Sequence, residues 1–138
     1  MRVVADTNII VSGLLWFGPP RRILDAARAG KIVLFTTRGL LVELKEVLRR
    51  EKLARRMHLV GAKPYELFVG VASLAKLLTS ETIPPTILDD PPDDEVLGCA
   101  VAAKADFIVS GNSHLLSLKE YRGIPIVTAS AFLARISP

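Results

Sequence analysis

Short runs of apolar residues recur along the chain, and most of them are rich in β-branched side chains. Runs of this kind between polar turns predict strands that are buried on both faces of a sheet. Pro125 stands at the last run and has no N–H to donate, so that strand is expected at a sheet edge. The predicted strands are residues 2–5, 31–35, 107–110 and 126–128, with a shorter one near 79–83.

Between the predicted strands, apolar residues recur every three or four positions, which is the spacing of one helix face. Pro19 opens one helix and Gly30 follows its end, while Thr36 or Thr37 stands where a side-chain cap is needed. The basic stretch that ends at His58 is expected to continue the third helix. The predicted helices cover about residues 9–15, 19–30, 37–58, 64–78 and 93–104, with only a short turn after residue 112 and a last short helix.

Strands that alternate with helices in this way are typical of a parallel sheet that is covered on both faces. The expected fold class is therefore α/β, a three-layer α/β/α sandwich with a central, mainly parallel sheet of four to five strands. The chain has 138 residues, half of them hydrophobic, without repeats or low-complexity segments, so residues 1–138 are expected to form one domain. In such sheets, sites form beyond the carboxyl ends of the strands.

Positive charge is concentrated in the first half of the chain, although the formal net charge is only +4. Residues 1–69 hold 13 Lys and Arg against 6 Asp and Glu, whereas residues 70–138 hold 5 against 8. A basic region of this kind suits the phosphates of a nucleic acid, and a solvated basic helix face is the plain alternative. The candidates for phosphate contacts are Arg49, Arg50, Lys52, Arg55 and Arg56.

The cysteine content and the apolar runs suggest the compartment. Cys99 is the only cysteine, so no internal disulfide forms, and its apolar surroundings predict a small core residue. Asp6 interrupts the apolar N-terminal stretch, which argues against a signal peptide. No apolar run approaches the roughly 18 residues that span a bilayer. A cytoplasmic protein without a membrane segment is expected.

Negative charge is crowded into residues 89–95, where five of the seven residues are acidic. Carboxylates at the start of a helix are favoured by its dipole, which accounts for one or two of Asp93, Asp94 and Glu95. Crowding of further carboxylates costs repulsion unless solvent or a cation offsets it. The segment is therefore a candidate cation site, with helix capping as the alternative.

Two other carboxylates are predicted near the same edge of the sheet. Asp6 ends the first strand, where it either serves a site or simply caps the next helix. Glu43 lies beside the apolar stripe of the third helix, and a solvated surface position is its plain alternative. Ligand sets made only of oxygen suit Mg²⁺ or Mn²⁺. Zinc is disfavoured because one cysteine and the distant His58 and His114 form no recognisable ligand set.

Four segments together resemble a PIN domain, and they cover nearly the whole chain. They are VVADTNIIVSGLL, LLVELKEVL, PDDEVLGCAVAAKADFIVSGN and IPIVTASAFL. The resemblance is closest to the PIN-family toxins of toxin-antitoxin systems, which are similar to VapC toxins. It implies a metal-dependent ribonuclease that acts on RNA, a homodimer and a cognate antitoxin protein.

The resemblance also assigns roles to individual residues. The metal-binding and catalytic carboxylates of the family correspond to Asp6, Glu43 and Asp94, with Asp93 as a neighbour that shapes the site. Asp89 and Asp90 are expected to be exposed in the loop. Hydrolysis by a metal-activated water then needs no side-chain nucleophile, and the family resemblance implies a 5′-phosphate and a 3′-hydroxyl as products.

Near the end of the third long motif, the chain departs from the family pattern. The family often has Thr/Ser-Gly-Asp after the penultimate strand, but this chain has Ser110, Gly111 and Asn112. Asparagine supplies a neutral oxygen, which weakens one metal position and implies reduced activity or one-metal catalysis. Asn8 and Ser110 are small polar positions that support the site, or else they serve only turns and caps.

Two other functional classes are compatible with the sequence. A receiver or phosphatase-like α/β protein also carries acids at strand ends, but phosphatases with an aspartate nucleophile need a second aspartate two positions later, where this chain has Asn8. A descendant of the nuclease fold that binds RNA or a partner without cleavage is favoured by Asn112. The retained Asp6, Glu43 and Asp94 argue against it.

Overall fold

The computed structural model describes residues 1–87 and 91–136. Its centre is a six-stranded sheet in the order β3-β2-β1-β4-β6-β5, and every neighbouring pair is parallel except β5 with β6. The α/β fold class is confirmed. The sheet has six strands instead of the expected four to five, and two of the six, β3 and β5, are only two residues long. The strands are β1 (Arg2–Ala5), β2 (Val33–Thr36), β3 (Lys76–Leu77), β4 (Phe107–Val109), β5 (Glu120–Tyr121) and β6 (Ile124–Val127).

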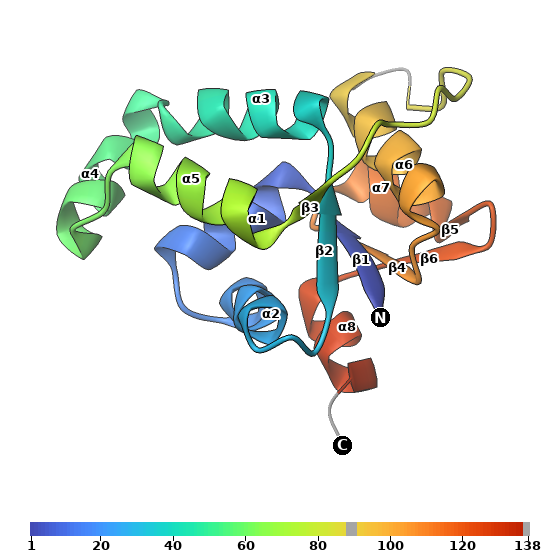
Figure 1. The fold of residues 1–138 in the computed structure, drawn as a ribbon, viewed down its shortest axis with the longest axis horizontal. Helices are drawn as coiled ribbons and strands as arrows, with labels where there is room; N and C mark the ends of the chain where they lie inside the picture. Colours follow the sequence, from blue (N-terminus) through green and yellow to red (C-terminus); the bar gives the residue numbers. More distant parts are fainter. Residues whose placement is uncertain (88–90, 137–138) are drawn as a thin grey trace.

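Helices lie on both faces of this sheet (Figure 1). Val3 and Ala5 of β1 contribute to one hydrophobic cluster together with residues of α1, α2 and α8. Val4, which points to the opposite face, packs in a second cluster with residues of α6 and α7. The helices are α1 (Thr7–Leu15), α2 (Pro19–Arg28), α3 (Arg38–Leu48), α4 (Glu51–Val60), α5 (Pro64–Leu74), α6 (Pro91–Ala103), α7 (Ser113–Leu118) and α8 (Ala129–Ile136).

The single long helix predicted from residue 37 to 58 is wrong, because the chain forms α3 and α4 with a break between them. Arg50 has extended backbone angles, φ −66° and ψ 135°, and serves as the N-cap of α4. The break turns α4 so that Leu53 and Met57 are buried in the core. Tertiary burial of these two side chains therefore overrides the helical continuity of the sequence.

The short strand predicted near residues 79–83 is also wrong. The extended pairing lies earlier, at β3, where Lys76 is in register with Phe35 and Leu77 with Thr36 of β2. Because these residues pair with the sheet, α5 ends at Leu74 instead of continuing to residue 78. Residues 78–87 contain no helix or strand.

The C-terminal part of the sheet differs from the expectation as well. The strand that contains Pro125 is β6, which lies between β4 and β5 and is not an edge. Pro125 is in register with Glu120 of β5 but lies outside the pairing of β6 with β4, which joins Ile126 to Ile108 and Val127 to Val109, so its missing N–H leaves that pairing intact. The short turn expected after residue 112 is instead the helix α7, and β5 follows it.

The topology places the starts of three helices at one edge of the sheet. Helices α1 and α3 directly follow the carboxyl ends of the parallel strands β1 and β2. Helix α6 leads into β4. Its C-terminal end lies near the amino ends of the strands, because Asp106, shortly after α6, accepts a hydrogen bond at 2.7 Å from the amide of Arg2 at the start of β1. The N-terminus of α6 therefore lies at the carboxyl edge, beside the starts of α1 and α3.

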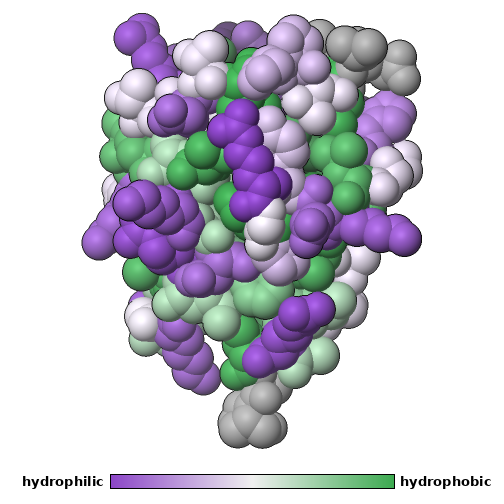
Figure 2. Space-filling model, turned by 90° about the vertical axis from the view of Figure 1, so that its right-hand side faces the viewer, coloured by the Kyte–Doolittle hydropathy of each residue, from purple (hydrophilic) through white to green (hydrophobic). Residues whose placement is uncertain are grey.

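The surface mixes polar and apolar side chains. On the face shown in Figure 2, hydrophobic residues are interspersed with hydrophilic ones and do not form one broad area. The large exposed hydrophobic residues include Phe17, 83% exposed, and Tyr65, 74% exposed. Within residues 1–87 and 91–136, no helix combines the length and apolar character that a bilayer span requires.

Candidate active site

Asp6 is the centre of the candidate site, because it is a buried carboxylate at the carboxyl end of β1. It is the N-cap of α1, and its Oδ1 accepts a hydrogen bond from the amide of Ile9 at 2.8 Å. Its own amide donates to the carbonyl of Val109 in β4 at 3.0 Å. Only 4% of Asp6 is exposed, which is unusual for a residue that serves only as a helix cap.

Ser110 holds the other carboxylate oxygen of Asp6. The Ser110 hydroxyl donates to Oδ2 of Asp6, and Ser110 is completely buried at the end of β4. The same hydroxyl oxygen accepts from the amide of Asn112 at 2.9 Å. Asp6 and Ser110, both predicted from the sequence as candidate site residues, are therefore in direct contact.

Burial dominates the electrostatics of Asp6. Desolvation raises the pKa of the Asp6 carboxyl above its ordinary value of 3.8. Hydrogen bonds from Ser110 and from the amides of Ile9 and Gly111 act in the opposite direction but do not cancel the effect of burial. A nearby cation would favour the charged form, so this carboxylate suits a cation site.

Thr37 and Glu95 connect two of the helices that start at this edge. Thr37 is the N-cap of α3, where its hydroxyl oxygen accepts from the amide of Leu40 at 3.3 Å. The same hydroxyl donates to Oε1 of Glu95 in the first turns of α6 at 2.7 Å. Glu43 lies half-buried further along α3. The sequence suggested a cap at Thr37 but not its contact with Glu95, because the two residues are far apart in the chain.

The two aspartates at the start of α6 have different surroundings. Asp94 accepts hydrogen bonds from the amides of Thr86 at 3.1 Å and Ile87 at 2.8 Å, so it fastens the preceding segment to the helix. Asp93 is 8% exposed and lies on the same helix face as the buried Leu97 and Ala100. Asp93 thus points toward the sheet, whereas Asp94 is engaged with the loop backbone.

The remaining predicted polar residues are spread around this edge. Asn8 is exposed in the first turn of α1. Asn112 is the N-cap of α7, where its side-chain oxygen accepts from the amide of His114 at 2.7 Å. The predicted exposure of Asp89 and Asp90 falls outside the described residues.

Four of the five basic candidates are exposed, namely Arg49, Arg50, Lys52 and Arg55. Arg56 differs from them, because its Nε donates to the carbonyl of Leu15 at 2.6 Å and its guanidinium lies 5.3 Å from the centre of the Trp16 ring. These contacts tie α4 to the C-terminal end of α1. Arg56 therefore has a structural role, whatever else it binds.

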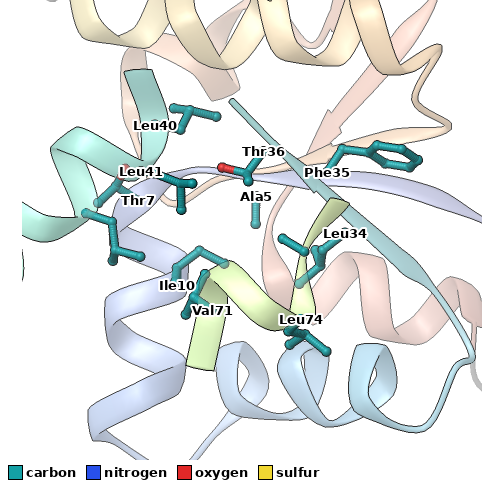
Figure 3. A pocket seen from close by; sticks show the side chains of 12 residues that line it. Ala5, Thr7, Ile10, Leu34, Phe35, Thr36, Leu40, Leu41, Val71 and Leu74 are labelled. Atoms are coloured by element: carbon teal, nitrogen blue, oxygen red, sulfur yellow. The ribbon is translucent and has the colours of Figure 1, made fainter. Parts of the chain in front are cut away.

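A small cavity of about 20 Å³ lies among β1, β2, α1, α3 and α5, and its lining includes Ala5 and Thr7, the chain neighbours of Asp6. Figure 3 shows Ala5, Thr36, Leu41 and Val71 arranged around it. Its lining is mostly apolar, with Thr7 and Thr36 as the polar residues. The volume suits a water molecule and is far too small for a nucleotide. The cavity therefore belongs to the packing beneath the site.

A preassembled metal centre is not observed in the described part of the chain. There, no group of three or more His, Cys, Asp or Glu side chains is arranged to hold a metal ion. The acidic side chains at the carboxyl edge do, however, offer only oxygen donors, which are the ligands that Mg²⁺ and Mn²⁺ prefer. The chemistry of the donors thus fits a hard divalent cation, although the side chains do not surround a common point.

Comparison with known proteins gives the family. A search of curated proteins found no match. The model of the PIN domain family matches residues 2–114, which is most of the chain and includes all of the candidate acids. PIN domains are generally nucleases, and they typically use divalent metals such as Mg²⁺. With its parallel α/β sheet and its match over residues 2–114, the chain belongs to the PIN domain family.

Proposed function

We propose that this protein is a metal-dependent endoribonuclease that hydrolyses RNA phosphodiester bonds with Mg²⁺ or Mn²⁺. The observation that carries the proposal is the buried carboxylate of Asp6, held by Ser110 at the carboxyl edge of the sheet in a PIN-family chain. Burying a carboxylate costs free energy unless an opposite charge offsets it, and a bound divalent cation would supply that charge.

The proposed cation ligands are Asp6, Glu43 and one aspartate at the start of α6. The sequence pointed to Asp94, and it remains one of the two candidates. Asp93 is favoured here because it lies on the buried face of α6, while both oxygens of Asp94 already accept from loop amides. In this arrangement Asp94 positions the segment that leads into α6, and Asp93 supplies the ligand.

A bound divalent cation supplies Lewis acidity toward the attacking water and the scissile phosphate. The protein contributes fixed donors around it. The amide of Ile9 and the hydroxyl of Ser110 hold Asp6 in one orientation, so little reorganisation accompanies binding. Hydrolysis breaks the bond between phosphorus and O3′, and the products are a 3′-hydroxyl and a 5′-phosphate, as the family resemblance implies.

An RNA cleavage assay tests this proposal. The purified chain of residues 1–138 is expected to cleave labelled RNA in Mn²⁺ or Mg²⁺ and to be inactive in EDTA. Asp6→Asn is expected to remove the activity, since it replaces a carboxylate ligand by a neutral group while retaining the helix cap. Equal cleavage by wild type and Asp6→Asn would reject the assignment.

A second candidate function is RNA or partner binding without cleavage. It is supported by Asn112, which supplies no carboxylate and whose side chain caps α7. Mn²⁺ binding without turnover on any RNA would favour this alternative. Restoring an acid by Asn112→Asp tests the same point, because a gain of cleavage would identify Asn112 as the cause of low activity.

We further propose that the protein is the toxin of a toxin-antitoxin pair, that it forms a homodimer, and that a cognate antitoxin binds it. These three proposals rest on the resemblance of the motifs to VapC-like toxins. Growth arrest on expression, relieved by co-expression of a neighbouring small open reading frame, would support the toxin role. Light scattering of the purified chain measures the oligomeric state directly.

A further inference from the structure

A second pocket, distant from Asp6, lies between the C-terminal end of α3 and the start of α5. Its volume is about 460 Å³, which is within the range of small-ligand sites. Half-buried Pro64 and Phe68 contribute its apolar part, and exposed side chains contribute the rest. The lining consists of Lys45, Arg49, Lys63, Pro64, Tyr65 and Phe68.

The pocket is lined by three cations and by no acid. Lys45 lies in the last turn of α3, Arg49 is the C-cap one helical turn later, and Lys63 is the N-cap of α5. None of the three forms a salt bridge within residues 1–87 and 91–136. Three uncompensated positive charges around one cavity favour a ligand with more than one negative charge.

An aromatic ring stands beside these cations. Tyr65 is 74% exposed, whereas tyrosine side chains in folded proteins are on average much more buried. Aromatic rings next to Lys and Arg are the usual means of binding single-stranded nucleic acid, because the ring stacks on a base while the cations contact phosphates. An acidic peptide would satisfy the charges but would make no specific use of the ring.

We propose that this pocket binds one nucleotide of single-stranded RNA outside the cleavage site, with the base on Tyr65 and the phosphates on Lys45, Arg49 and Lys63. The choice of RNA as the occupant rests on the proposed ribonuclease function. The observations that point to a ligand in the pocket are independent of that function and consist of the cavity, its three cations and the exposed ring of Tyr65.

The position of the pocket relative to Glu43 fits a flanking contact. Arg49, the C-cap of α3, follows Glu43 by six residues, which is about 9 Å along the helix axis. Lys45 and Arg49 line the pocket beside α5, whereas Glu43 is rotated around the helix by roughly 160° from Lys45 and roughly 120° from Arg49, at about 100° per residue. The pocket and Glu43 are therefore on different sides of α3, so this pocket serves a flanking nucleotide at a distance from the scissile phosphate and not that phosphate itself.

RNA binding in EDTA tests the inference separately from cleavage. The probe is a short fluorescein-labelled single-stranded RNA of mixed sequence, and its anisotropy is measured with the purified chain of residues 1–138. Tyr65→Ala is expected to weaken binding by about tenfold, the loss of one stacked base, while Tyr65→Phe binds like the wild type. Arg49→Ala and Lys63→Ala are each expected to lower the salt dependence of log affinity by about 0.7, the loss of one phosphate contact.

Arg22→Ala is the matched control, because Arg22 is an exposed cation on α2, outside the pocket. It removes the same charge and is expected to leave affinity within about twofold of the wild type. Tyr65, Arg49 and Lys63 are exposed, so their substitution removes no core packing, and thermal melts of the variants verify that they fold.

Two results would overturn the inference. One is unchanged RNA affinity in the Tyr65, Arg49 and Lys63 variants, or an equal loss in Arg22→Ala. The other is displacement of the RNA by an acidic peptide as effectively as by unlabelled RNA, which would identify a protein-binding pocket. If pocket-dependent binding is found but no metal produces cleavage, the proposed ribonuclease function fails and this inference stands. If cleavage is found without pocket-dependent binding, the proposed ribonuclease function stands and this inference fails.

Discussion

The hydroxyl of Ser110 donates a hydrogen bond to Oδ2 of Asp6, and the two residues are 104 positions apart in the chain. This contact joins the carboxyl ends of the neighbouring parallel strands β4 and β1. It fixes the orientation of a carboxylate that burial would otherwise tend to protonate. The candidate site therefore depends on the sheet itself and not on a mobile loop.

Ser110→Ala is expected to weaken Mn²⁺ binding by about 10- to 100-fold, the usual effect of removing a group that orients a metal ligand. Ser110 is completely buried, so the substitution also leaves the amide of Asn112 without its acceptor. Calorimetric titration measures the affinity. Ser110→Thr keeps the hydroxyl and is the control, and equal Mn²⁺ affinity in the alanine variant would show that Ser110 does not position the ligand.

Asp6→Asn is expected to stabilise the metal-free protein at neutral pH. The pKa of Asp6 is raised in the folded state, so the stability that this group contributes is fully present below its unfolded pKa of about 3.8 and is lost as the pH rises through the folded value. The asparagine variant carries no such titration. Thermal unfolding in EDTA should therefore show a gap between variant and wild type that widens from acidic to neutral pH. A gap that is constant with pH would contradict the raised pKa.

Cys99 is expected to resist thiol reagents in the native protein. Burial, with a smaller contribution from the charge of Glu95, raises the pKa of the Cys99 thiol to about 12, and the residue is completely buried on α6. Thiolate is the reactive form, so labelling should require unfolding. Mass spectrometry after iodoacetamide treatment along a urea series should give a labelling midpoint equal to the unfolding midpoint. Rapid labelling without urea would contradict this packing of α6.

Gly98→Ala is expected to destabilise the fold by about 1–3 kcal/mol, the usual cost of overpacking. A Cβ at Gly98 would meet the side chain of Ser80 and would lie 2.5 Å from the carbonyl oxygen of Glu81, so the segment before α6 would have to move. Gly70→Ala in α5 is the matched control, because nothing lies within 4 Å of its added Cβ. That variant should be stabilised by about 0.5–1 kcal/mol. Urea unfolding of both variants measures the difference.

The sequence was sufficient for the fold class and for the edge of the sheet at which the candidate residues Asp6 and Ser110 meet. Buried β-branched runs such as residues 2–5 predict parallel strands, and polar residues at their carboxyl ends, such as Asp6 and Ser110, then fall at one edge. The break at Arg50 had no local signal, since it contains neither proline nor glycine and depends on burying Leu53.

The details at the start of α6 were beyond the sequence for a geometric reason. Adjacent residues on a helix differ by 100° in direction, so the phase of the helix decides whether Asp93 or Asp94 points inward. That phase is set by packing of Leu97 and Ala100 against the sheet. The contact of Thr37 with Glu95 likewise depends on how α3 and α6 approach each other.

Mn²⁺ binding, followed by electron paramagnetic resonance in the wild type and in Asp6→Asn, Asp93→Asn and Asp94→Asn, tests the central claim most directly. We expect the wild type to bind Mn²⁺, Asp6→Asn and Asp93→Asn to lose it, and Asp94→Asn to retain it while unfolding at a lower temperature. The loss of the Thr86 and Ile87 contacts explains the lower unfolding temperature of the last variant. Wild-type protein that leaves Mn²⁺ free, or Asp6→Asn that binds it undiminished, would contradict a metal site at this edge of the sheet.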